Sequence, residues 1–237
     1  MKKTGLIVSS LCLALGLSAT AQGQVSASEA KKLGTTLTPM GAERAGNKDG
    51  SIPEWRGGIQ FPPNSYKQPG QHHPDPFPSD QPLFVITSKN MAKYDKYLTE
   101  GQKGLFKTYP DTFKMPIYKT RRTAAAPQWV YDNTLGNAKN AKLAKGGNGV
   151  DNAMGGIPFP IPKSGVEAIW NHNLRFRGEF ALRRASEVAV QRDGGYSLIT
   201  TQAEMLFNYY RRDITQDELD NVAVYYLSFT KAPARLA

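Results

Sequence analysis

Residues 47–52 read Asn-Lys-Asp-Gly-Ser-Ile, which is similar to the start of a calcium-binding loop. Such a loop needs oxygen ligands at positions 1, 3 and 5, glycine at position 6 and a bidentate glutamate at position 12. With Gly50 at position 6, Ala45 stands at position 1 and Arg56 at position 12. Both anchoring carboxylates are missing, so we predict a tight turn and no metal site. This turn should deliver Ile52 and Trp55 to a core.

The other side chains that could bind a metal or move a proton are three histidines. His72 and His73 stand beside Asp75, but no third metal ligand follows at a usable spacing. His172 lies between two asparagines, where a hydrogen-bonded polar helix face is the simpler interpretation. The chain has neither a Gly-x-Ser-x-Gly elbow nor a phosphate loop. The residues therefore predict no metal, no cofactor and no enzymatic activity.

Residues 1–27 have the layout of a secretory signal peptide, with two lysines, a short apolar run and small residues after it. The apolar run is too short to span a bilayer, and cleavage is expected after Ala21 or Ala27. Cys12, the single cysteine, lies inside this run and not behind small residues, which argues against a lipid anchor. We expect a periplasmic protein of a Gram-negative cell.

The chain of 237 residues carries 30 basic and 20 acidic side chains, a formal net charge of +10. The basic residues form separate doublets, such as Arg121-Arg122 and Arg211-Arg212. For a secreted protein, acidic lipids or an acidic protein are more accessible partners than nucleic acid, which we exclude. An even spread of charge that serves solubility is the alternative.

The N-terminal half predicts short elements around an irregular stretch. Residues 53–82 hold 8 of the 16 prolines and must follow an extended path. The expected elements are a helix at 28–34, a strand at 84–87, helices at 88–98 and from Thr99, and strands at 113–118 and 128–131. The glycine-rich residues 136–156 should form a mobile loop or a weak amphipathic segment.

The C-terminal part predicts one helix and then β-structure. Ser164 and Glu167 form a capping box, and Val166, Ile169, Trp170 and Leu174 should form the apolar helix face. An Arg-Asp-Gly-Gly turn joins strands at 188–190 and 196–201, and further strands are expected at 204–210 and 222–229.

The strand at 222–229 is apolar or aromatic on both faces. A solvated antiparallel sheet would have one polar face. We therefore expect one face to meet the core, and the other to meet helices, a cavity or further chain. Since the chain stops soon after this strand, we expect a fragment cut within a larger sheet.

Two stretches together, 37–55 and 155–178, resemble a family of secreted Gram-negative proteins of unknown function, labelled outer-membrane lipoprotein-sorting-protein-like. Family members are usually longer than this chain. The resemblance implies the α+β architecture of the lipoprotein carriers LolA and LolB. That architecture is a curved antiparallel sheet, an incomplete barrel, with helices packed on its concave face and long Pro/Gly-rich loops. Residues 28–237 would be the N-terminal part of one such domain, truncated.

The resemblance also implies a carrier of lipid, acyl-chain or other apolar cargo between the inner and outer membrane. An efflux-type inner-membrane transporter or an outer-membrane protein would be its partner. The resemblance supplies no catalytic residues. We expect the cargo cavity to be lined by Ile157, Phe159, Ile161, Ile169, Trp170, Tyr225 and Leu227, with ordinary core packing as the alternative for each. The alternative function is a periplasmic adaptor that binds no lipid, and a hydrolase has no motif in its support.

Overall fold

The computed structural model describes residues 25–68 and 70–232. The expected signal peptide lies almost wholly outside these residues. The helices are α1 Ala27–Ala30, η1 Met91–Tyr97, α2 Glu100–Thr108, α3 Gln128–Asn140, η2 Lys145–Gly147, α4 Gly165–Asn173, η3 Asn208–Tyr210 and α5 Gln216–Leu219. The strands are β1 Phe84–Thr87, β2 Lys114–Ile117, β3 Lys142–Leu143, β4 Val150–Asp151, β5 Phe180–Val190, β6 Tyr196–Leu206 and β7 Tyr226–Lys231. None of the described helices is long and apolar enough to cross a membrane.

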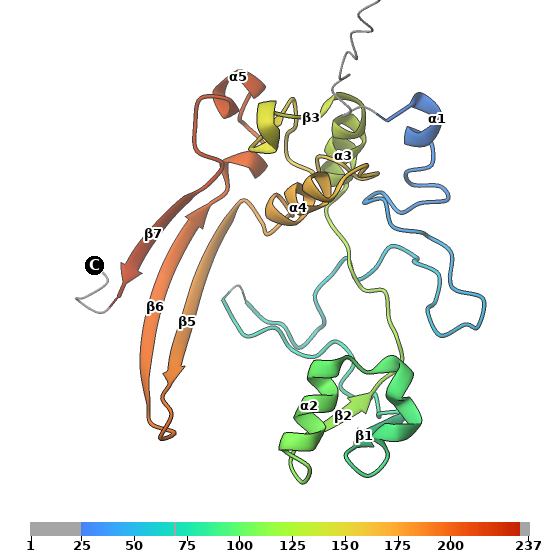
Figure 1. Ribbon diagram of the computed structural model, residues 1–237. Coiled ribbons are helices and arrows are strands. Elements are labelled where there is room, and N and C mark those ends of the chain that lie inside the picture. The colour runs from blue at the N-terminus through green and yellow to red at the C-terminus, as the bar shows by residue number, and fades with distance from the viewer. Residues whose placement is uncertain (1–24, 69, 233–237) are drawn as a thin grey trace, which may run out of the picture.

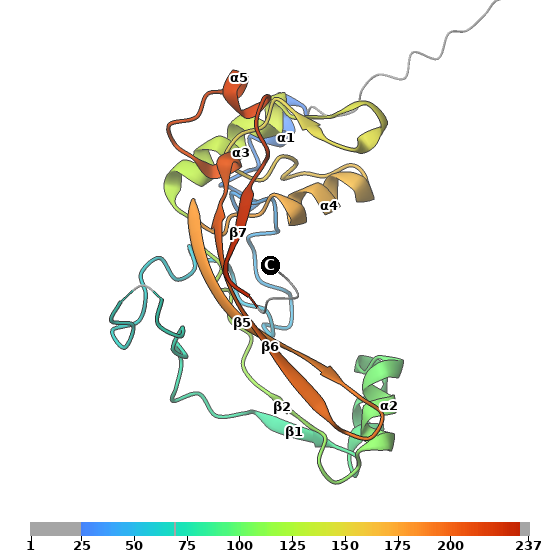
Figure 2. The ribbon, with the colours of Figure 1, turned by 90° about the vertical axis from the view of Figure 1, so that its left-hand side faces the viewer.

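The described strands form three antiparallel sheets, and none of these sheets closes into a barrel. This confirms a mixed α+β fold with antiparallel sheets. The largest sheet has the order β5-β6-β7, and β5 pairs with β6 from Phe180↔Leu206 to Val190↔Tyr196. The predicted Arg-Asp-Gly-Gly turn joins these two strands. Figure 2 shows the sheet curving, with α4 on its concave side.

Two hydrophobic cores divide the molecule into a main body and a small body (Figure 1). The main body contains α3, α4, α5 and the β5-β6-β7 sheet, and its core includes Val130, Phe159 and Tyr210. The small body, residues 83–117, packs around Ile86, Leu98 and Phe106. Residues 55–82 and 118–127 connect the two, and residues 55–82 form the predicted irregular path.

The small body confirms most of the sequence predictions. Strands β1 and β2 lie where they were expected, and Thr99 caps α2 in a reciprocal pair of hydrogen bonds with Gln102, of 2.9 and 3.3 Å. The helix expected at 88–98 is a 3₁₀ helix, η1. Three residues per turn align Met91 with Tyr94, and both pack against the small core.

The strand predicted at 128–131 is wrong, because these residues form the first turn of α3. Trp129, Val130 and Tyr131 favour strands, but Pro127 stands at the N-cap, where a fixed φ suits a helix start. The buried residues recur at helical spacing: Val130, Thr134, Asn137 and Ala138. Burial of this stripe outweighs local β-propensity, and α3 extends into the expected loop at 136–156.

Helix α4 forms as predicted, but its apolar face is only partly buried. Ser164 Oγ accepts a hydrogen bond from Glu167 N at 3.2 Å, as a capping residue should. The predicted capping box is only half formed, because the Glu167 carboxylate accepts from Lys163 N at 2.5 Å and not from Ser164 N. Glu167 turns inward and is 2% exposed. Because this turn buries Glu167, Val166 and Ile169 point outward and are 47% and 60% exposed. Leu174 is buried, and Trp170 packs partly against the core.

The strand predicted at 222–229 begins only at Tyr226. Residues 223 and 224 instead tie the chain to η3: Asn208 Nδ2 donates to Ala223 O at 2.8 Å, and Tyr209 N donates to Val224 O at 3.1 Å. All six residues of β7 are exposed, so the expectation that one face meets the core is wrong for the described chain.

Candidate functional site

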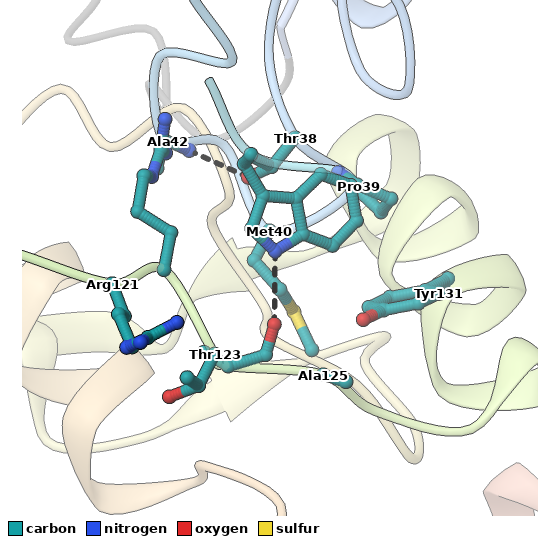
Figure 3. A pocket seen from close by; sticks show the side chains of 11 residues that line it. Thr38, Pro39, Met40, Ala42, Arg121, Thr123, Ala125 and Tyr131 are labelled. Carbon is teal, nitrogen blue, oxygen red and sulfur yellow. Dashed lines mark hydrogen bonds between the residues drawn. The ribbon is translucent and has the colours of Figure 1, made fainter. Parts of the chain in front are cut away.

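Cavity 1 lies between the N-terminal segment, residues 121–125 and α3, with a volume of about 370 Å³ (Figure 3). Its lining is mostly apolar: Thr38, Pro39, Met40, Ala42, Trp55, Arg121, Arg122, Thr123, Ala124, Ala125 and Tyr131. Trp55 forms one wall of this cavity. Its Nε1 donates to Ala124 O at 2.9 Å, and its ring is perpendicular to that of Tyr131, with the ring centroids 6.5 Å apart.

The 47–52 turn places this tryptophan. Asn47 Oδ1 accepts from Ile52 N at 2.8 Å, and Asp49 Oδ1 accepts from Ser51 N at 2.9 Å. Hydrogen bonds from Ser51 lower the pKa of Asp49. The side-chain oxygens of Asn47 and Asp49, which would bind the metal in a calcium loop, therefore accept hydrogen bonds from backbone amides. The turn delivers Trp55, but Ile52 stays 45% exposed, so that part of the prediction is wrong.

Both arginines of cavity 1 are already engaged. The Arg122 guanidinium donates to the carbonyls of Glu43 at 2.6 Å and Arg44 at 3.0 Å, with longer contacts to two more carbonyls. Arg121 forms a two-pronged pair with Asp80, at 2.6 and 2.8 Å, and stacks on Phe77 at 3.8 Å. Their charges hold the chain together, so cavity 1 is a structural junction.

Cavity 2, of about 420 Å³, lies between the C-terminal end of α4, the segment that follows it, and the sheet. The lining residues are Trp170, Asn173, Leu174, Arg175, Arg177, Met205, Phe207, Tyr209, Tyr210, Val224, Tyr225 and Leu227. Trp170 is fixed by a 2.9 Å hydrogen bond from its Nε1 to Gly147 O. Phe207 and Tyr225 contact one another with ring centroids 6.1 Å apart.

Two buried tyrosines contribute to the lining of cavity 2. The Tyr209 hydroxyl donates to Gly156 O at 2.8 Å, and the Tyr210 hydroxyl donates to Leu174 O. Burial raises the pKa of both phenols above the ordinary value of 10.0. Both therefore stay neutral at ordinary pH, and their rings form part of the cavity wall.

Met205 of β6 and Leu227 of β7 line cavity 2, so the cavity adjoins the sheet, whose curvature and α4 on its concave side are seen in Figure 2. Pairing places Ala181 opposite Met205 and Met205 opposite Leu227, and these side chains share a face. The same alternation adds further residues, so that the apolar members of this concave face are Ala181, Ala185, Ala189, Ile199, Ala203, Met205, Leu227 and Phe229. Leu227 is 46% exposed, so the apolar surface continues from the cavity along the sheet.

Three of the seven residues expected to line a cargo cavity, Trp170, Tyr225 and Leu227, meet in cavity 2. Phe159 lies in the main core, Ile157 and Ile161 are half-buried before α4, and Ile169 faces outward. The sequence analysis missed Met205, the aromatic run from Phe207 to Tyr210, and the two arginines after α4. The signal for the segment from Phe207 to Tyr210 was available in the sequence, as an aromatic run at the end of a predicted strand.

Residues 85–237 match the family model described as "Protein of unknown function (DUF1329)". The chain belongs to this family. It is also 44% identical over 238 residues to the uncharacterized protein PA3922 of Pseudomonas aeruginosa, an alignment that covers 100% of this chain and 52% of the relative. The chain thus spans about half the length of the curated relative that it matches. No solved structure matches it significantly.

The DUF1329 match includes every residue that lines cavity 2. Only part of the lining of cavity 1 falls within the match, because its lining residues between 38 and 55 precede residue 85. The Pseudomonas relative aligns with both regions. Cavity 2, unlike cavity 1, lies wholly within the DUF1329 region, and we take it as the candidate functional site.

Proposed function

We propose that the protein is a periplasmic carrier of lipid-like or other apolar cargo between the inner and outer membrane. One observation carries the proposal: cavity 2 is walled by aromatic and aliphatic side chains and continues into an uncovered apolar sheet face. An exposed apolar surface is costly in water unless a ligand or partner covers it. An acyl chain gains about 0.8 kcal/mol for each methylene that it buries there.

The shape of the site suits a long, thin ligand. A strand of eleven residues, such as β6, spans about 35 Å, which exceeds the length of an ordinary acyl chain. The curved sheet with α4 on its concave side supports a LolA/LolB-like arrangement, in which the unclosed sheet would be part of an incomplete barrel. The expected transporter or outer-membrane partner would receive or deliver the cargo.

Among the described residues no strand pairs with the outer edge of β7, and this edge supports a second candidate, the adaptor that binds a protein and no lipid. All six residues of β7 are exposed, and an unpaired strand edge can accept a strand from a partner. An adaptor would need this edge but not cavity 2.

The test uses the full-length protein, exported to the periplasm and purified without detergent. Native mass spectrometry should detect co-purifying lipid, and a dansyl-labelled undecanoate should bind with increased fluorescence. Leu227→Gln should weaken this binding at least tenfold, because it places a polar amide on the apolar path. Tyr226→Gln is the matched control. Tyr226 is the neighbour of Leu227 in β7, but its side chain lies on the opposite face of the sheet and is 54% exposed.

Protein that is consistently empty and ignores the probe would sink the carrier proposal. Equal loss in both variants would place the binding elsewhere than the concave face. Crosslinking in cells that depends on β7 but not on Leu227 would favour the adaptor.

A further inference from the structure

We propose that the cargo has an anionic head group, a carboxylate or a phosphate, which Arg175 and Arg177 bind at cavity 2. This inference rests on the proposed carrier function and names the class of cargo. It begins with the backbone after α4. Arg175 and Arg177 are exposed, and half-buried Phe176 lies between them. Phe176 points into the core and contacts Trp129 and Tyr210, with ring centroids 5.7 and 5.1 Å away.

The two arginines therefore project together, away from the core, and both line cavity 2. The Arg177 guanidinium lies 5.9 Å from the ring centroid of Phe207, a wall of the cavity. Arg175 is steadied by a 2.9 Å hydrogen bond from its Nη1 to His172 O, which leaves its other nitrogens available. The charges thus stand beside the apolar wall.

These two charges have no acidic counterpart at the site. No aspartate or glutamate lines cavity 2, and no ion pair found in the described chain involves Arg175 or Arg177. A third cation, Arg183 of β5, also lies on the concave face. The carboxylate on this face, Glu187, is four residues further along β5. In cavity 1, by contrast, Asp80 and backbone carbonyls engage both arginines. Cavity 2 therefore offers positive charge to a ligand.

The geometry suits one anion with an apolar tail. Two residues along the chain separate the arginine backbones by at most about 7 Å, so two flexible side chains can converge on one head group. Guanidinium groups match carboxylate and phosphate oxygens through paired hydrogen bonds. Trp170, Met205 and Leu227 supply the adjoining apolar surface. A fatty acid and a phospholipid share this chemistry.

The test compares four ligands with the same twelve-carbon chain: dodecanoate, dodecyl phosphate, dodecanol and dodecyltrimethylammonium. The three ionic ligands are kept below their micelle concentrations, and dodecanol is kept below its solubility limit. Calorimetry on the delipidated full-length protein should show either anion binding at least tenfold more tightly than dodecanol and the cation. The stronger of the two anions identifies a fatty-acid or phosphate-type head group. Added sodium chloride should weaken anion binding and leave dodecanol binding unchanged.

The variant Arg175→Gln/Arg177→Gln should reduce the anion preference to less than threefold while dodecanol still binds, which also shows that the variant is folded. Arg184→Gln is the control, because its side chain lies on the opposite sheet face and donates to Gln202 Oε1 at 2.8 Å. If all four ligands bind equally, the carrier proposal is supported and the proposal of an anionic head group is wrong. Anion preference that survives in the double variant also overturns the assignment, and binding of no ligand removes the carrier function itself.

Discussion

Four arginines show how the surroundings of a residue decide its role. Arg121 and Arg122 are neighbours in an extended segment and form different attachments, one to Asp80 and one to the carbonyls around Glu43. Their charges are satisfied within the chain. Arg175 and Arg177 stand beside an apolar cavity with no carboxylate among the lining residues. The first pair stabilises the fold, and the second is available to a ligand.

Arg122→Lys should lower the free energy of unfolding by about 1–3 kcal/mol, because an ammonium cannot reproduce the planar fork that reaches several carbonyls. Arg122 Nη1 and Nη2 reach Arg44 O and Glu43 O at 3.0 and 2.6 Å. Urea unfolding at neutral pH measures the change. Arg56→Lys is the control, since the Arg56 side chain is 84% exposed. Equal midpoints for the two variants would contradict the structural role.

Asp80→Asn should destabilise the protein more at neutral pH than in acid. Hydrogen bonds from Arg121 lower the pKa of Asp80 below its ordinary value of 3.8. A carboxyl with a depressed folded-state pKa contributes stability above the unfolded-state pKa and loses it as pH falls through the folded one. The difference between the wild type and the variant should therefore shrink as the pH falls through the lowered folded-state pKa of Asp80.

Urea midpoints at pH 7 and pH 2.5 test this convergence. Asp111→Asn serves as the control, because no ion pair involves Asp111 in the part of the chain that the structure describes. A difference between wild type and Asp80→Asn that is the same at both pH values would show that the charge pair is not its origin.

At the scale of elements, α3 is held by the loop that follows it. Thr134 and Asn137 are buried polar residues of α3. Thr134 Oγ1 accepts from Ile157 N at 3.1 Å, and Asn137 exchanges hydrogen bonds of 3.0 and 3.1 Å with Met154. Gly156 makes this close approach possible, since a Cβ there would lie 2.7 Å from Thr134 N and 3.0 Å from Val130 O.

Gly156→Ala should therefore lower the free energy of unfolding by about 1–3 kcal/mol, because the loop must move away from α3. Gly136→Ala is the matched control within α3, where nothing lies within 4 Å of the added Cβ. That change should stabilise the helix by about 0.5–1 kcal/mol. Thermal unfolding of both variants measures the contrast, and the same sign in both would contradict the packing argument.

Local signals predicted the elements whose ends have characteristic residues. Thr99 and Ser164 mark two helix starts, and Asp193-Gly194 marks the β5–β6 turn. The first turn of α3 was missed because its β-branched and aromatic residues gain burial only when the distant 153–159 loop packs on them. Of the residues that line cavity 2, the sequence pointed to Trp170, Tyr225 and Leu227. Arg175 and Arg177 were missed, because they line the cavity together only when Phe176 between them packs on Trp129 and Tyr210.

At the scale of the whole molecule, the curved sheet has two unequal edges. Edge strand β5 carries Arg183, Arg184 and Glu187, and charges on an edge discourage pairing with other chains. Edge strand β7 reads Tyr-Leu-Ser-Phe-Thr-Lys, with one charge at its end. Its exposed backbone groups and apolar side chains make it the edge to which another strand should pair.

This chain should self-associate through β7 as its concentration rises, and Ser228→Lys should suppress that association. A lysine in the middle of an edge strand places a charge that a second strand would have to bury. Ser228 shares its sheet face with Glu204, opposite to Leu227, so affinity for a dansyl-labelled acyl probe should not change. Sedimentation velocity at increasing concentration measures the association.

Ser197→Lys is the control, because it adds the same charge on the central strand β6, beyond the segment paired with β7. If both lysines suppress association equally, net charge and not the β7 edge governs it. If only Ser228→Lys acts and the acyl probe still binds, the edge and the concave face are separable surfaces. A carrier needs this separation if one surface holds the cargo while the other meets a partner strand.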